Sequence, residues 1–445
     1  MRSANLRQCA ASEPTVGSSR CAIASDPLAV TRLPSVLGLP LRPRRTFAYL
    51  LVFAAAAVGT GLVRTVTTTY LPLLLADIRE APALIGLVMM VNSAAGFAMP
   101  LLVGRWSDRR HTPRHGRRPF IVVGSLLAAC GLSAVALGHG TSFLVLTLAG
   151  TLAYVGVNIV MTAHRALVHD CFDVDRFAQG NGALEVATLV GGLVGLALGG
   201  LLTSLALWAP FVLAAIGMPL LAWPTVSRLP VSDPGEPERL QPWPLRFYAT
   251  AMIRPGVRAL LAAEILWVIG YAALPVFFIL YARRVLGLAP GLASLWLAAF
   301  ALGAGLAMIA AGFIRNPRRH KPFLALGVAL MGAGFLAAGG STNLVAVSFA
   351  CGLAAAGFGL LSTLGFSLFA ALIPQGEAGG YTALYYSLRA VASALAVPMA
   401  GLIIAASGSY RSLFVLGGVA TLASLVPLAF APSLHAASDL TRRLQ

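Results

Sequence analysis

Twelve apolar runs dominate the pattern of hydrophobic and polar positions along this 445-residue chain. Most of them have the roughly 20 residues that a helix needs to cross a bilayer. They lie near residues 47–75, 84–103, 119–138, 143–168, 179–203, 206–226, 257–281, 290–313, 323–340, 344–373, 381–405 and 410–431. The pattern therefore predicts an all-α membrane protein with twelve transmembrane helices.

One long polar connection, residues 227–256, divides these spans into six at 44–226 and six at 257–432. Short matches between the two halves favour a repeat about an axis along the membrane normal. The matching segments are Ala178-x-Gly180-x-x-Ala183-Leu184 with Ala378-x-Gly380-x-x-Ala383-Leu384, and Pro119-Phe120 with Pro322-Phe323. We expect residues 1–43 to form a disordered cytoplasmic tail, because they lack both a sustained period and an apolar signal-peptide core. We place residues 433–445 in a second cytoplasmic tail.

Charge adds the orientation of the chain in the membrane. Only 11% of the residues are charged and 58% are hydrophobic, whereas soluble proteins carry about 25% charged residues. With both termini inside, 25 Lys and Arg fall in inside segments and 4 in outside loops. This bias predicts a multi-pass protein of the cell membrane with both termini cytoplasmic. The net charge of +17 lies in the gaps between apolar runs, so it indicates topology and not a nucleic-acid partner.

The most charged stretch runs from Gly104 to Phe120 and contains six Arg residues. Each Arg in hydrocarbon costs about 2.5 kcal/mol or more, so this loop must face water. It resembles the cytoplasmic signature of the major facilitator superfamily, G-x-x-x-D-(R/K)-x-G-R-(R/K). The matching residues are Gly104, Asp108, Arg109, Gly116, Arg117 and Arg118, with a longer gap before Gly116. The resemblance implies two six-helix bundles around a cavity with alternating access, and a gating role for these residues.

Two motifs are similar to the sucrose-transporter and glycoside–pentoside–hexuronide branch of that superfamily. The loop continues as GRRPFI, and Arg165-Ala166-Leu167 followed by Asp170 matches the RALxxD of that branch. The second motif adds Arg165 and Asp170 to the gating residues. Sucrose transporters carry an Asp where this chain has Tyr154, whereas the Asn typical of them is kept as Asn158. The missing acid argues against proton-coupled uptake of sucrose itself.

A rival signature in the fifth span is similar to that of antiporters, G-x8-G-x3-G-P-x2-G-G. All its glycines are present, but Leu196 replaces the Pro; the glycines are Gly182, Gly191, Gly195, Gly199 and Gly200. Small residues also let helices approach closely, so these glycines indicate either tight helix packing or antiport.

Ionisable residues inside spans are the main candidates for substrate binding and coupling, because they are costly there and usually line a cavity. Glu264 leads an aromatic series, Trp267, Tyr271 and Phe278, that falls on one helix face and suits a sugar or a cation. The further candidates are Arg389 with Tyr386 and Ser393, Glu185, Tyr154 with Asn158, and Arg64. Arg389 pairs with Glu264 or Glu185, or holds an anion; Arg64 either serves the cavity or extends toward the membrane surface. Arg165 either pairs with Asp170 or another loop acid, or contacts substrate.

These features predict a secondary active transporter, coupled to protons or another cation, for a small polar solute such as a sugar or glycoside. The alternative is proton-driven efflux of a drug or metabolite. No phosphate-binding loop, metal-ligand spacing or nucleophile constellation is visible, so we expect neither an enzyme nor a cofactor or metal. We expect a monomer in the lipid bilayer whose partners are the small-molecule substrate and the coupling ion.

Single Cys residues at Ser232 and Ser341, in a Cys-free background, test the orientation. We expect an impermeant thiol reagent to label position 341 on intact cells and position 232 only after permeabilisation, because 232 lies in the predicted cytoplasmic connection. Labelling of position 232 but not of position 341 on intact cells would show that the chain has the opposite orientation.

Overall fold

The computed structural model describes the backbone of residues 43–109, 117–172, 177–229, 245–314, 316–374 and 377–431. The chain divides into two units, Met1–Phe47 and Ala48–Gln445, and the helices discussed below belong to the second, with α1 beginning in the first. The expected tails, residues 230–244 of the 227–256 connection and the centre of the Gly104–Phe120 loop lie outside the described residues.

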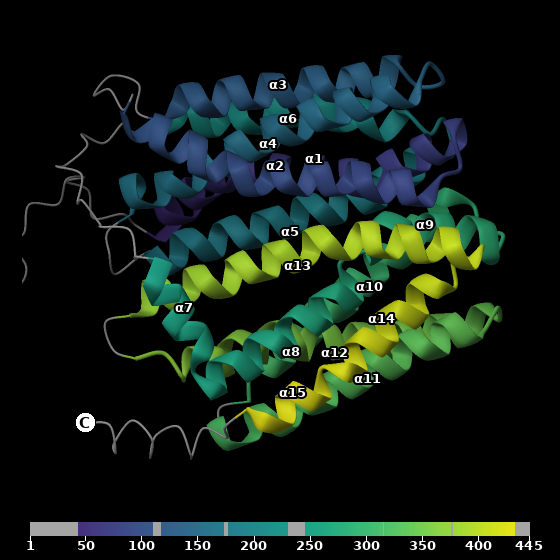
Figure 1. Ribbon diagram of the computed structural model, residues 1–445. Helices are drawn as coiled ribbons and strands as arrows, with labels where there is room; N and C mark the ends of the chain where they lie inside the picture. Colours follow the sequence, from purple (N-terminus) through teal and green to yellow (C-terminus); the bar gives the residue numbers. More distant parts are fainter. Residues whose placement is uncertain are drawn as a thin grey trace, which may run out of the picture. The chain divides into compact units, whose positions relative to one another are not determined.

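Every regular element in the described ranges is a helix (Figure 1). The first half has α1 (Pro43–Ile78), α2 (Pro82–Arg109), α3 (Arg118–Leu137), α4 (Phe143–Cys171), α5 (Phe177–Leu202) and α6 (Ala209–Arg228). The second half has α7 (Leu245–Ile253), α8 (Pro255–Tyr271), α9 (Leu274–Val285), α10 (Pro290–Gly312), the 3-10 turn η3 (Pro317–Arg319), α11 (His320–Gly340), α12 (Leu344–Ala370), α13 (Ala378–Ser407), α14 (Ser412–Ala423) and α15 (Leu425–Phe430).

The described residues contain 11 segments long and apolar enough to cross a membrane. The remaining predicted span lies in α2, where the shorter apolar segment Pro82–Val91 is described. The prediction of an all-α membrane protein with twelve transmembrane helices in two six-helix bundles is confirmed.

The seventh span departs from the expected continuous helix. It breaks into α8 and α9 at Ala272 and Ala273, where Pro275 follows in the first turn of α9 and supplies no backbone N–H. The expected aromatic face is therefore wrong beyond Tyr271. Phe278 instead packs in the core of the second half, edge-on to the ring of Phe414 at 6.4 Å between centroids. The predicted central loop also contains a helix, α7.

The two halves pack their helices in the same way (Figure 1). The third helix of the first half, α3, packs against α4 and α6, and its counterpart α11 packs against α12 and α14. The first repeated sequence segment, at Ala178 and Ala378, falls at the start of α5 and of α13. Corresponding elements thus occupy corresponding places in the two halves.

The second repeated segment marks a matching pair of helix caps. Arg118, just before Pro119-Phe120, donates a hydrogen bond to the backbone carbonyl of Leu229 after α6. Lys321, just before Pro322-Phe323, donates to the carbonyls of Ala429 and Ala431 at the end of α15. A cation at a helix C-terminus satisfies unpaired carbonyls and opposes the helix dipole. The repeated motif therefore connects α6 to α3 in the first half and α15 to α11 in the second half.

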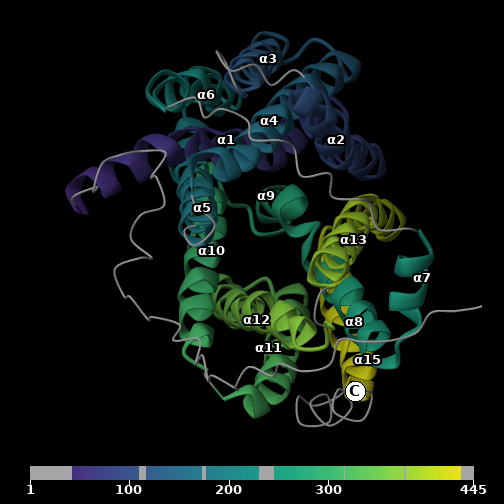
Figure 2. The same ribbon diagram turned by 90° about the vertical axis from the view of Figure 1, so that its left-hand side faces the viewer.

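Contacts between the halves pair α2 with α13 and α5 with α10 (Figure 2). Glycines allow these approaches. A Cβ on Gly86 would lie 2.9 Å from the carbonyl oxygen of Val397, and one on Gly200 would lie 2.7 Å from the Cβ of Ser294. Gly291 would meet the carbonyl oxygen of Gly200 at 2.6 Å. Gly86 and Gly291 lie near the N-terminal ends of α2 and α10, and Gly200 lies near the C-terminal end of α5.

Within the first half, α1 and α5 cross with their backbones in contact. A Cβ on Gly191 would overlap the carbonyl oxygen of Val58, and one on Gly61 would overlap the carbonyl oxygen of Thr188. Gly195 and Gly199 also face α1, against Thr65 and Tyr70. Close packing thus accounts for the glycines after Gly182 in the span-five signature.

We predict that Gly191→Ala lowers the free energy of unfolding by about 1–3 kcal/mol, because the new methyl group meets backbone atoms that cannot rotate away. Gly182→Ala, in the same helix, is the matched control. Nothing lies within 4 Å of its added Cβ, and Ala favours a helix over Gly by up to about 1 kcal/mol. Thermal denaturation in detergent measures both; equal melting temperatures for the two variants would contradict the packing account.

Candidate functional site

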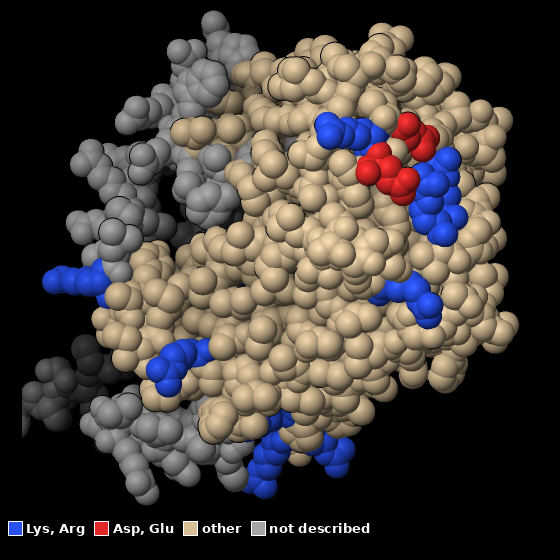
Figure 3. Space-filling model, turned by 45° about the vertical axis from the view of Figure 1, so that its right-hand side comes forward, with Lys and Arg blue, Asp and Glu red and all other residues tan. Residues whose placement is uncertain are grey.

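One end of the helix bundle carries ion pairs between the two halves, and we call it the ion-pair end. Asp77 at the end of α1 accepts from Arg283 of α9 at 2.7 Å, and Glu80 accepts from Arg284 at 2.7 Å. Figure 3 shows acidic side chains gathered against basic ones on one face of the molecule, beside broad uncharged surface. We call the opposite end, with Arg118 and Lys321, the basic end.

Tyr410, between α13 and α14, joins this network by donating to Glu80 at 3.5 Å. Burial and the neighbouring Glu80 carboxylate raise the pKa of Tyr410 to about 12. Its hydroxyl therefore stays protonated, and remains a donor, at physiological pH.

A buried hydroxyl pair adds a contact between the halves nearer the membrane centre. The Tyr70 hydroxyl of α1 donates to Ser294 Oγ of α10 at 2.9 Å, and both side chains are inaccessible to solvent. With the ion pairs and the glycine contacts, this bond joins the two halves at the ion-pair end.

Toward the basic end, helices of both halves line two adjoining cavities. The larger has a volume of about 580 Å³ and lies among α1, α5, α9, α10 and α12. The smaller, of about 310 Å³, lies among α1, α2, α4, α9 and α13. They share Arg64, Thr68, Tyr271 and Pro275. Their volumes are in the range of small-molecule sites.

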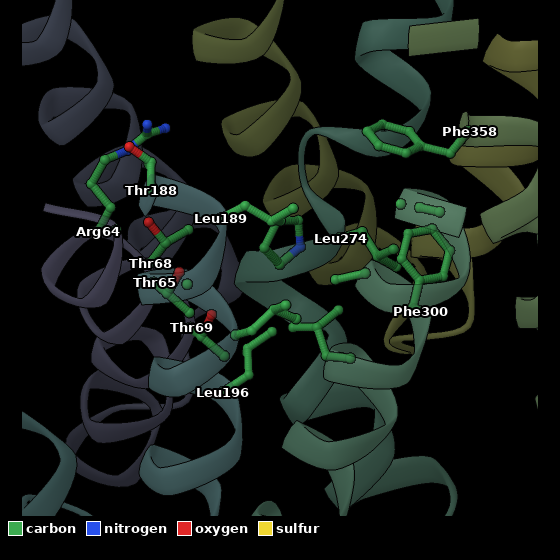
Figure 4. A pocket seen from close by; sticks show the side chains of 18 of the residues that line it. Arg64, Thr65, Thr68, Thr69, Thr188, Leu189, Leu196, Leu274, Phe300 and Phe358 are labelled. Carbon is green, nitrogen blue, oxygen red and sulfur yellow. The ribbon is translucent and has the colours of Figure 1, made fainter. Parts of the chain in front are cut away.

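The larger cavity has a polar wall and an apolar wall (Figure 4). Arg64, Thr65 and Thr68 from α1 and Thr188 from α5 lie on one side, and Phe300 and Phe358 lie on the other. The Tyr271 ring meets that of Phe358 edge-on at 4.8 Å between centroids. A solute with hydroxyl groups on one face and an apolar face on the other matches these walls.

Beside the smaller cavity lies a buried polar cluster made by Glu264, Tyr385 and Arg389. The Tyr385 hydroxyl donates to Glu264 Oε2 at 2.6 Å, and Arg389 Nη1 lies 3.4 Å from Oε1. The Glu264 side chain is 1% exposed and that of Arg389 is 32% exposed. The carboxylate is thus held away from solvent, while its cationic partner reaches the cavity wall.

The structure brings several predicted residues to this cluster and separates another. Tyr271 lines both cavities and lies under the Arg389 guanidinium, with 5.9 Å from Cζ to the ring centroid. Trp267 is buried and lies beside Glu264. Tyr386 is half exposed and stacks near Phe366, outside both cavities.

Arg165 and Glu185 form an ion pair of 3.0 Å between α4 and α5. Their side chains are 57% and 69% exposed, so Glu185 is not a buried acid. Arg165 therefore has a partner within a span, Glu185. The sequence left open pairing with a loop acid such as Asp170 or contact with substrate, and the side chain of Asp170 is not described. Glu185 also lines the larger cavity.

Tyr154 lines the smaller cavity, but Asn158 does not. Asn158 is 3% exposed, and its side-chain amide donates to the Tyr154 carbonyl oxygen at 2.7 Å. Its role in substrate binding stays a prediction that needs a rearrangement of α4.

Most of the gating motif lies at the edge of the described structure. Gly104, Asp108 and Arg109 are in the last turns of α2, where side chains are not described, and Gly116 lies outside the described residues. Arg117 precedes α3, and Arg118 caps α6 as described above. Asp170 falls in α4, but its side chain is not described either. The gating role remains a prediction.

Two residues of the site escaped the sequence analysis. Tyr385 precedes Arg389 by four positions, so helical spacing placed it on the same face, but the adjacent Tyr386 was chosen. Gly365 of α12 packs on the cluster, since a Cβ there would lie 3.2 Å from Trp267 Cζ2 and 3.7 Å from Glu264 Oε2. Only tertiary contacts reveal the second.

Membrane-spanning helices of two similar halves around a shared cavity define a membrane carrier. The sequence profile of the Major Facilitator Superfamily matches residues 53–397 and 268–442. The chain belongs to this superfamily. No curated protein sequence matches it.

Solved transporters share the fold at low sequence identity. A bacterial homologue of the human lysosomal transporter Spinster, inward-facing and occupied, is 17% identical, with 91% of this chain and 98% of that chain covered and a TM-score of 0.65. A D-xylose–proton symporter is 15% identical, with 87% and 98% covered and a TM-score of 0.69. An inward-facing bacterial homologue of the iron transporter ferroportin is 16% identical, with 86% and 99% covered and a TM-score of 0.65.

We predict that Tyr385→Phe lowers the free energy of unfolding by about 1.5–3 kcal/mol, because it removes the shortest hydrogen bond of a buried carboxylate. Tyr386→Phe is the matched control and should stay within about 0.5 kcal/mol, because that side chain is half exposed. Thermal denaturation in detergent measures both. Wild-type stability of Tyr385→Phe would show that the bond to Glu264 contributes nothing.

Proposed function

We propose that this protein is a proton-coupled secondary transporter of a small polar solute such as a sugar or glycoside. The observation that supports this proposal best is the Glu264, Tyr385 and Arg389 cluster beside the cavity. A carboxylate at membrane depth is costly and usually functional. Among the described residues, Glu264 is the only acid whose side chain is buried.

The coupling mechanism follows from the two partners of this carboxylate. With Arg389 close, the ionised form of Glu264 is neutralised, and when Arg389 moves away the protonated form is favoured. A change of that distance between two conformations lets Glu264 take a proton on one side of the membrane and release it on the other. Alternating access provides such a change, because the two halves rock about the substrate site.

The basic end faces the cytoplasm in this proposal, in keeping with the positive-inside rule. The contacts at the ion-pair end then close the outer side. The Arg165–Glu185 pair toward the basic end is more than half exposed, which favours an inward-facing state. Opening the outer side requires that Asp77–Arg283 and Glu80–Arg284 separate.

Efflux by antiport remains the second candidate from the sequence. Close packing against α1 accounts for Gly191, Gly195 and Gly199, so the glycine signature gives antiport little separate support. The apolar wall of the larger cavity suits a hydrophobic solute as well as a sugar face. The transport experiment therefore decides between import and export.

We predict that Glu264→Gln abolishes accumulation driven by a pH gradient in proteoliposomes but leaves counterflow exchange, because exchange moves no net proton. Glu185→Gln is the matched control: it also removes a carboxylate from a span, but from an exposed ion pair, and its effect should be milder. Uptake is measured with a panel of labelled sugars, with and without the gradient. If Glu264→Gln accumulates substrate as well as wild type, Glu264 is not the proton site.

A further inference from the structure

The smaller cavity is positively charged. Its wall carries Arg64 from α1 of the first half and Arg389 from α13 of the second. No Asp or Glu is among its described lining residues. The carboxylate nearest to Arg389 is Glu264, which is buried and outside the wall.

Arg64 forms no ion pair in the described part of the chain. No salt bridge or hydrogen bond joins its guanidinium to another described residue, although its side chain is exposed to both cavities. An Arg in the middle of a span is costly and is usually retained for a function. The unpaired donors face a space large enough for a small molecule.

Arg389 is only loosely paired. Its 3.4 Å contact with Glu264 is long for a charge-assisted bond, whereas Tyr385 holds the same carboxylate at 2.6 Å. A guanidinium carries five donors in a fixed fork that fits a carboxylate with two parallel bonds. Donors of Arg389 that do not bond Glu264 remain available at the wall of the cavity.

The geometry points to an anionic substrate: a hydroxylated monocarboxylic acid whose carboxylate binds between Arg64 and Arg389. This inference rests on the proposed function, because it takes the cavity as the transport site. Hydroxyls of Thr68, Tyr154 and Ser393 also line the cavity and suit the hydroxyl groups of such a solute. Before binding, with Glu264 ionised, the two Arg and one Glu carry a net charge of +1, which attracts an anion.

The same geometry couples the anion to the proton. The substrate carboxylate and Glu264 are rival partners of Arg389, so binding of the anion draws Arg389 away from Glu264. The uncompensated buried carboxylate then takes a proton from the solution on that side. Both leave together on the other side, where release of the anion lets Arg389 return and the proton dissociate. The anion and proton together carry no net charge.

Binding to purified full-length protein in detergent tests the charge of the ligand. The probes are D-gluconate, D-glucitol and D-glucamine, which share one hydroxylated chain and differ in one terminal group that is anionic, neutral or cationic. D-Glucitol 6-phosphate, which has the same hydroxylated chain, shows whether the site prefers a carboxylate or a phosphate. Thermal stabilisation against ligand concentration gives each affinity. We expect gluconate to bind at least about tenfold more tightly than the other three.

Variants assign the effect to the two Arg. Arg64→Gln and Arg389→Gln should each weaken gluconate binding about tenfold or more, since each removes a hydrogen-bonded charge. Arg64→Lys should retain part of the affinity, which a purely structural role would not predict. Arg258→Gln is the control, an exposed Arg of α8 that lines neither cavity, and it should bind as wild type.

Tighter binding of glucitol, glucamine or the phosphate, binding unaffected by both Gln variants, or no binding of gluconate each overturns the anion assignment. Uptake into proteoliposomes tests the anion assignment and the proposed proton coupling separately. Accumulation of a neutral sugar driven by a pH gradient would keep the proton-coupled function and reject the anion. Binding of gluconate that depends on Arg64, without any effect of the gradient, would keep the anion site and reject proton coupling.

Discussion

The cost of placing charge at membrane depth constrains this structure more than any single contact. Glu264 is tolerated inside the second half because Tyr385 and Arg389 satisfy its carboxylate. Arg64 is tolerated because it faces a cavity and not lipid. The same constraint places the remaining described ion pairs where they meet water. Arg64 and Arg389 line a cavity at the boundary between the halves, and Glu264 lies beside it; this boundary is where a carrier moves.

Glycine contacts hold the two halves together at one end of that boundary, whereas cavities separate them toward the other end. Gly86, Gly200 and Gly291 let α2 meet α13 and α5 meet α10 near the ion-pair end. Because backbone lies against backbone there, the fit is tight and depends on small residues. The ion pairs of Asp77 and Glu80 lie at the same end, but their side chains are 35–46% exposed, and such pairs contribute little stability. Separating them is therefore inexpensive, which suits an alternating contact.

The sequence predicted the spans well because lipid demands long apolar runs with their backbone hydrogen bonds satisfied internally. It also singled out Glu264 and Arg389, because charge inside a span is rare and informative. The structure places these two side chains in contact, while their role in transport stays a prediction. It failed where tertiary structure decides. The helix break after Tyr271 places Phe278 in the core. Helical spacing puts both Tyr385 and Tyr386 near the face of Arg389, and only the directions of their side chains in the structure distinguish them. Pairing of Arg165 with Glu185 depends on how α4 crosses α5, which no local pattern encodes.

The central claim is that Glu264 exchanges a proton as Arg389 exchanges its partner. Proton uptake by the purified protein in weakly buffered solution, followed with a pH indicator as gluconate is added, tests this claim most directly. The account predicts uptake of about one proton per bound anion by the wild type and none by Glu264→Gln, because only a carboxylate in the cluster can take the proton that accompanies binding. The same proton uptake by both proteins, or binding without uptake by the wild type, would contradict it.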